Sequence, residues 1–143
     1  MSKSQKIALL LETLICFYPA LYFLVGGTFL AVGLAGHSNY GSVTFPALLF
    51  LFLGYLGLAG VIALLIKILS PSTKTLSPLA IKINIGIGML VYSFFTFGPV
   101  YISITSGRVE PYVFIYLLTD FLPIICSIHL LWLGRGYVYK SSS

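Results

Sequence analysis

Long apolar runs, separated by short polar stretches, fill nearly the whole chain. The runs cover residues 7–34, 45–69, 80–106 and 112–134. Each is long enough to cross the hydrocarbon core of a bilayer as a helix, which takes about 20 mostly apolar residues. None alternates apolar and polar residues over short segments, as the strands of a membrane barrel do. The pattern therefore predicts an all-α fold, an integral membrane four-helix transmembrane bundle forming a single polytopic domain over residues 1–143.

The polar stretches between the runs are predicted to be loops. Residues 35–44 form a Gly/Ser-rich loop, and residues 70–79 contain prolines that should stop one helix and start the next. Pro46 falls in the first turn of the second predicted helix, where its missing N–H costs nothing. The fourth helix should close near Gly134 and Gly136, either of which could take the left-handed cap conformation.

Composition agrees with the membrane class and excludes others. The apolar fraction is 59% and the charged fraction 8%, whereas soluble chains carry about a quarter charged residues. The net charge of +5 raises the question of nucleic-acid binding. The basic residues are scattered at the ends of apolar runs, without a basic face or binding motif, so we expect no nucleic-acid partner.

The basic residues predict the orientation in the membrane, because short loops rich in Lys and Arg stay cytoplasmic. Seven fall on one side of the four predicted spans, and only Arg108 falls on the other. The seven are Lys3, Lys6, Lys67, Lys74, Lys82, Arg135 and Lys140. Both termini are therefore expected in the cytoplasm, in a multi-pass protein of a bacterial inner membrane.

Glu12 and His129 are predicted to lie at a similar depth. Each is about five residues from the cytoplasmic end of its span, or roughly 8 Å at 1.5 Å per residue. We expect them to pair across the bundle. Such a pair is either a proton-responsive switch or a polar clasp between the first and last helices, and the third alternative is a Glu12 that reaches to water by itself.

Asp120 lies deeper, about eight residues or roughly 12 Å from the outer boundary. An acid at that depth must face protein or water. It is either an ion or proton site, a contact for another membrane protein, or a hydrogen-bonded structural acid. It is nine residues from His129 and so on the opposite helix face. Hydroxyl groups predicted at its depth are those of Thr28, Tyr55, Thr96 and Tyr101.

Small residues and prolines mark packing and bending positions. Rows of small residues let helix backbones approach closely, and packing within the bundle is favoured over a face for a homo-oligomer. The rows are Gly27, Ala31 and Ala35 in the first span, and Gly54, Gly57 and Gly60 in the second. Prolines inside spans free a backbone carbonyl and kink the helix. These are Pro19, Pro99 and Pro123.

The sequence carries no catalytic or metal motif. Cys16 and Cys126 lie inside apolar runs, at depths where a contact is conceivable, and are interpreted as buried inert thiols. Cys126 and His129 share a helix face, but two ligands do not complete a tetrahedral metal shell. We therefore expect no enzyme activity, no metal and no cofactor.

Three functions remain from this sequence. The first is a non-enzymatic protein that recognises another membrane protein or an inserted peptide through helix faces, as an immunity protein against a pore-forming toxin does. The second is a small oligomeric transporter or channel that uses Glu12 or Asp120 as its ion or proton site. The third is an accessory subunit of a larger membrane complex. Besides the lipid bilayer, the expected partner is another membrane protein or toxin.

Overall fold

The fold is all-helical, as predicted. A computed structural model describes residues 2–35, 41–106 and 112–138, without the side chains of residues 34–35, 41–44, 95–96, 98–100, 102, 104, 112–120 and 138. Helices make up most of the described residues, which contain no strand. The helices are α1 (Lys3–Ala35), α2 (Gly41–Leu69), α3 (Pro78–Thr105), α4 (Tyr112–Leu133) and α5 (Arg135–Val138).

Three helices begin before the apolar runs that predicted them, α3 by only two residues, at Pro78. α1 starts at Lys3 rather than residue 7, and α2 starts at Gly41 rather than residue 45. Pro46 therefore lies inside α2 and not in its first turn, which corrects the sequence interpretation. The reason is that helical hydrogen bonding continues through polar residues such as Ser4 and Gln5, whereas hydropathy marks only the apolar part of a helix.

The connection between α2 and α3 follows the predicted chemistry. After α2 ends at Leu69, Ser77 caps the next helix: its hydroxyl accepts a hydrogen bond from the N–H of Ala80 at 3.2 Å. Pro78 is the first residue of α3, a position whose N–H has no partner within the helix. This serine and proline account for the sharp start of α3.

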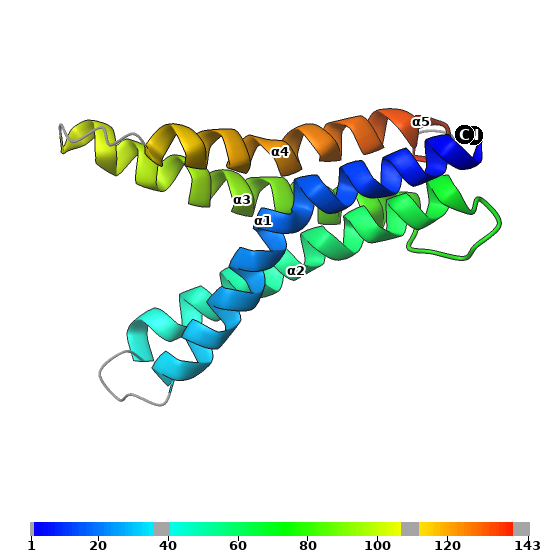
Figure 1. The fold of residues 1–143 in the computed structure, drawn as a ribbon. Helices are drawn as coiled ribbons and strands as arrows, with labels where there is room; N and C mark the ends of the chain where they lie inside the picture. The colour runs from blue at the N-terminus through cyan, green and yellow to red at the C-terminus, as the bar shows by residue number, and fades with distance from the viewer. Residues whose placement is uncertain (1, 36–40, 107–111, 139–143) are drawn as a thin grey trace.

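The four long helices are packed together at one end of the molecule and separate at the other (Figure 1). The packed end, called the closed end here, holds the start of α1, the end of α2, the start of α3 and the end of α4. Beyond it, α1 and α2 continue as one arm, and α3 and α4 continue as a second arm in a different direction (Figure 1). α1 turns in its middle third, where Pro19 lies inside the helix.

The core occupies the closed end. Its most completely buried side chains come from α2, α3 and α4, each less than 2% exposed. These are Leu64, Ile81, Ile85, Leu130 and Cys126. α1 contributes Leu9, Phe17 and Ala20, which follow one another at helical spacing along a single face.

A contact between two glycines brings α2 and α3 together. A Cβ atom built on Gly57 would lie 2.3 Å from the Cα of Gly88, so the two backbones touch. One turn away, a Cβ on Gly60 would lie 2.7 Å from the Cβ of Asn84. Only glycine fits here, because any side chain would push the helices apart. These glycines pack within the molecule.

Each arm has contacts of its own. In the α1–α2 arm, the hydroxyl groups of Thr28 and Tyr55 are 3.1 Å apart, and Leu24 and Leu51 pack over glycines of the facing helix. In the α3–α4 arm, the rings of Phe97 and Phe121 meet edge to face at 6.2 Å. The arms are therefore two helix pairs, each held by its own side chains.

The surface of the helices is apolar, which reverses the pattern of a soluble bundle. α1 buries Phe17, yet Leu14 and Ile15 on its other side are 63% and 64% exposed. Two stretches, Lys3–Gly33 and Phe45–Leu69, are long and apolar enough to cross a membrane by length and composition. Within the described residues, Pro78–Phe94 and Phe121–Leu133 are shorter apolar helical stretches.

Candidate functional site

Glu12 of α1 and His129 of α4 meet at the closed end. The Nδ1 atom of His129 lies 2.6 Å from Oε1 of Glu12, so the ring N–H donates to the carboxylate when the glutamate is ionised. The contact predicted from their matching depths is therefore confirmed. The two side chains are 40% and 38% exposed, so the pair lies at the edge of the bundle and not in its core.

Two cysteines lie one helical turn from this pair, and Thr13 directly follows Glu12 in the chain. Cys126 is 1% exposed, and its thiol interacts with the side chains of Cys16 and Thr13 on α1. Thr13 donates its own hydroxyl to the carbonyl of Leu9 at 2.7 Å, which leaves its oxygen free to accept. Both cysteines are free thiols, so this contact between α1 and α4 is non-covalent.

The polar row continues along α4 toward its end. The ring of Trp132 stacks on that of His129, with centroids 6.4 Å apart and an interplanar angle of 26°. The guanidinium carbon of Arg135 in turn lies 5.1 Å from the centroid of the Trp132 ring. Consecutive members of this row are three residues apart and therefore neighbours, while the row turns around the helix from the buried Cys126 through His129 to the exposed Trp132 and Arg135.

The arrangement links two helices through a hydrogen bond between an imidazole and a carboxylate. Within the described residues, no group of three His, Cys, Asp or Glu side chains could hold a metal ion. The site is therefore a polar contact between the first and fourth helices, placed beside a stack of aromatic and cationic groups.

Asp120 lies in α4, on the arm that α4 forms with α3, and its side chain is outside the described residues. Two of the hydroxyls proposed for it have other partners. Thr28 donates to the carbonyl of Leu24 at 2.7 Å and meets Tyr55 across the other arm. Tyr101 is 70% exposed on the surface of α3. The Thr96 side chain, like the predicted loop around His37, is outside the described residues.

The small-residue positions pack against neighbouring helices of the same chain. A Cβ on Gly27 would lie 2.9 Å from the Leu51 side chain, and one on Gly54 would lie 2.6 Å from the Leu24 side chain. A leucine of the facing helix therefore occupies the space beside each glycine. Ala31 is 3% exposed, while the side chain of Ala35 is outside the described residues. These contacts are the intramolecular packing that the sequence favoured.

The prolines have different surroundings. Pro123 is buried inside α4, and Pro19 is half-buried inside α1. The Pro99 side chain lies outside the described residues. Whether Pro123 kinks its helix stays a prediction.

The end of α4 differs from the predicted helix cap. Neither Gly134 nor Gly136 is in the left-handed conformation; instead the chain turns once and re-enters helix as α5. Gly134 is required by close packing, because a Cβ there would lie 2.6 Å from Leu64. Tyr137 then holds α5 in place by donating its hydroxyl to the carbonyl of Leu76 at 3.1 Å.

Sequence reasoning missed three features of the site. Trp132 and Arg135 were assigned to the membrane boundary and to topology, and the spacing of three residues that makes Trp132 a neighbour of His129 was not used. Lys6 was interpreted only as a topology signal, yet it donates to the carbonyl of Leu69 at 2.7 Å and so caps α2. Gly88 gave no signal of its own, because its role depends on Gly57 of another helix.

Comparisons with protein-family models, with curated proteins and with solved structures found no match to this chain.

Proposed function

We propose that this chain is a four-span transmembrane bundle with both termini in the cytoplasm, as in a bacterial inner membrane. Support comes from the exposed apolar surface of the helices and from the basic side chains at the closed end. Lys6, Lys67 and Arg135 all lie near helix ends there. A closed end rich in basic residues belongs on the cytoplasmic side by the positive-inside rule. The arms then separate toward the outer leaflet.

We infer that the protein acts without catalysis, by recognising a helix of another membrane protein or an inserted peptide. The separation of the two arms carries this proposal. Outside the closed end, α2 and α3 part and leave apolar helix sides that the rest of the described chain does not cover (Figure 1). In a bilayer these helix sides contact either lipid chains or another apolar helix. A helix makes more specific packing contacts with them than lipid chains do.

Two stacked phenylalanines mark the position where a partner would first touch both arms. Phe50 of α2 and Phe94 of α3 have ring centroids 5.3 Å apart and an interplanar angle of 14°. Phe94 is nevertheless 63% exposed. An immunity protein that holds an inserted toxin helix is one example of such recognition, and an accessory subunit bound permanently to a larger complex is another.

Photo-crosslinking in native membranes tests the proposal. A benzoyl-phenylalanine at position 94 should crosslink to one discrete membrane protein or peptide, since the ring stands where the arms part. The same probe at Leu14, which is 63% exposed on the closed end, should give only lipid adducts. Identical patterns from the two positions, without a discrete product at position 94, would reject helix recognition between the arms.

Asp120 is the polar residue proposed to contribute specificity on the α3–α4 arm. Asp120→Asn should reduce recovery of the crosslinked partner, because a deep carboxyl group is a strong intramembrane contact. The variant should leave ion flux through liposomes unchanged. Full recovery of the partner by Asp120→Asn would remove this residue from the recognition surface.

The Glu12–His129 contact favours a second candidate, proton-coupled transport by a small oligomer. It joins a carboxylate and an imidazole at 2.6 Å on the edge of the bundle. This candidate predicts pH-dependent flux from purified protein in liposomes, abolished by Glu12→Gln or by Asp120→Asn. Such a flux, lost with either substitution, would replace the recognition proposal.

A further inference from the structure

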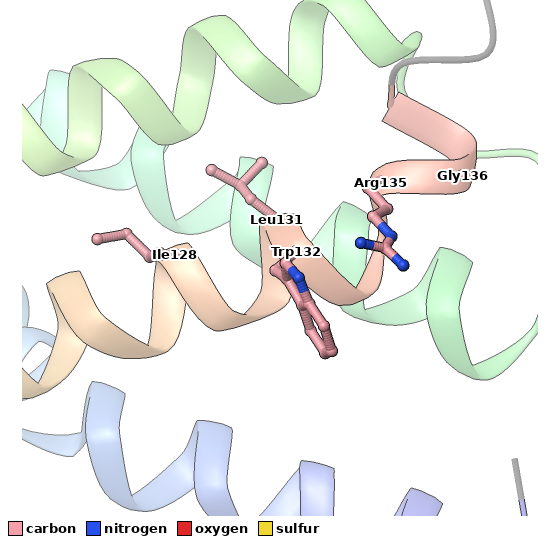
Figure 2. A pocket seen from close by; sticks show the side chains of 5 residues that line it. All are labelled: Ile128, Leu131, Trp132, Arg135 and Gly136. Carbon is pink, nitrogen blue, oxygen red and sulfur yellow. The ribbon is translucent and has the colours of Figure 1, made fainter.

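A shallow groove runs along α4 where this helix turns into α5. It has a volume of about 610 Å³ and is lined by Ile128, Leu131, Trp132, Arg135 and Gly136. Figure 2 shows these side chains around the bend, with Ile128 and Leu131 along α4 and Arg135 at the start of α5. A groove of this volume suits one small ligand or part of a lipid rather than a folded protein.

The end of the groove near α5 is cationic. Arg135 is exposed, and within the described residues it has no carboxylate partner, because the ion pair of the site joins Glu12 and His129. Its guanidinium lies over the ring of Trp132, which fixes the position of the charge. A guanidinium in that position keeps N–H donors available for two oxygens of a phosphate.

Two other cations at the closed end already have contacts within the chain. Lys6 donates to the carbonyl of Leu69, and Lys67 donates to that of Thr73 at 3.2 Å while lying 4.7 Å from the centre of the Tyr137 ring. Both hold helix ends together. Arg135 differs from them because its described contact is an aromatic face and not a carbonyl oxygen.

The rest of the groove is apolar and points toward the bilayer. Ile128 is 57% exposed and Trp132 is 58% exposed, so both offer apolar surface to a neighbouring chain. Seven residues separate Ile128 from Arg135, or roughly 10 Å of helix. That length places the cation at headgroup level while Ile128 lies among the acyl chains. Gly136 leaves open space beside the arginine, since a Cβ there would meet nothing within 4 Å.

We propose that this groove binds an anionic phospholipid of the cytoplasmic leaflet. The phosphate is held by the Arg135 guanidinium, and one acyl chain lies along Ile128 and Leu131. The inference rests on the membrane insertion proposed above. An anionic headgroup is favoured over phosphatidylcholine because the positive choline would oppose Arg135, whereas each basic residue near an anionic surface contributes about 1 kcal/mol.

Trp132 allows a direct test, since it is the single tryptophan of the chain. The full chain is reconstituted in phosphatidylcholine vesicles that contain a small share of brominated lipid, whose chains quench tryptophan fluorescence on contact. At equal low content, brominated phosphatidylglycerol should occupy the groove with about fivefold preference over brominated phosphatidylcholine and quench Trp132 correspondingly more.

Charge variants separate a specific site from general attraction to the surface. Arg135→Gln should remove the preference for phosphatidylglycerol, and Arg135→Lys should retain part of it. Lys74→Gln removes the same charge from the exposed loop between α2 and α3 and should keep the full preference. Helix content measured by circular dichroism checks that each variant is folded.

Two results would overturn the site. Equal quenching by the two brominated lipids in the native chain, or an unchanged preference in Arg135→Gln, shows an inserted protein without an anionic-lipid site. Absence of quenching by both lipids would show that Trp132 does not contact acyl chains. That result would reject the proposed membrane insertion and not only the lipid site.

Discussion

Glu12 is an acidic residue on a helix whose neighbouring exposed positions are apolar. Leu11 and Leu14 beside it are 57% and 63% exposed, so nothing on α1 itself offsets the carboxylate. The partner comes from α4, where His129 reaches Oε1 at 2.6 Å. An interhelical hydrogen bond in a membrane protein typically contributes about 1 kcal/mol. The pair therefore contributes only modestly to the free energy that holds the first and fourth helices together.

A double-mutant cycle measures that contribution. Glu12→Gln and His129→Gln should each lower the free energy of unfolding in detergent, and together they should show a coupling of about 1 kcal/mol. Combining Glu12→Gln with Lys74→Gln, a distant loop position, provides the control and should be additive. A cycle without coupling at Glu12 and His129 would contradict the contact.

The Glu12–His129 contact could be predicted from the sequence. The contacts of Trp132 and Arg135 that extend it along α4 could not. Counting residues from the span ends placed Glu12 and His129 at one depth because both lie in uninterrupted apolar runs. The stack of Trp132 and Arg135 depends on side-chain direction around the helix. That direction also decides whether Asp120 faces protein or lipid.

At the scale of the elements, the closest contact is between α2 and α3. It depends on Gly57 and Gly88, whose backbones touch, and both arms diverge outward from this crossing region (Figure 1). Hydropathy located these two helices to within a few residues, because the apolar run marks the interior of each helix and misses only its polar first residues. The choice of touching faces requires both helices at once, and therefore Gly88 was not predicted.

Gly57→Ala tests this contact. The added methyl group would meet the Gly88 backbone, which cannot rotate away, so the free energy of unfolding should fall by about 1–3 kcal/mol. Gly86→Ala is the matched control on α3, since its methyl group would meet nothing within 4 Å. Thermal unfolding in detergent provides the measurement. If both alanine variants unfold at the same temperature as the native chain, the two helices do not touch there.

For the whole molecule, the orientation of the closed end determines how each proposal applies. The groove on α4 needs the cytoplasmic leaflet, and the space between the arms needs the outer one. Both follow if the loop of residues 70–77 and both termini face the cytoplasm. The positive-inside rule makes that prediction from charge alone, without reference to packing.

Cysteine labelling in cells checks the orientation. In a chain with Cys16 and Cys126 replaced by serine, a cysteine at Ser72 should resist a membrane-impermeant maleimide until the cells are opened. A cysteine at Ser2 should behave in the same way, because both positions lie at the closed end. Labelling of either position in intact cells would place that end outside and invert the assignment of the leaflets.

The divergence of the arms has a consequence for the surrounding lipids. The helices are gathered at one end and spread at the other (Figure 1), so a protein inserted as proposed has a larger cross-section in one leaflet than in the opposite leaflet. Lateral pressure then acts unequally on the two halves of the molecule. Bilayers with strong spontaneous curvature would change the distance between the arms. Lipid shape and the entry of a partner helix would therefore both act on that distance.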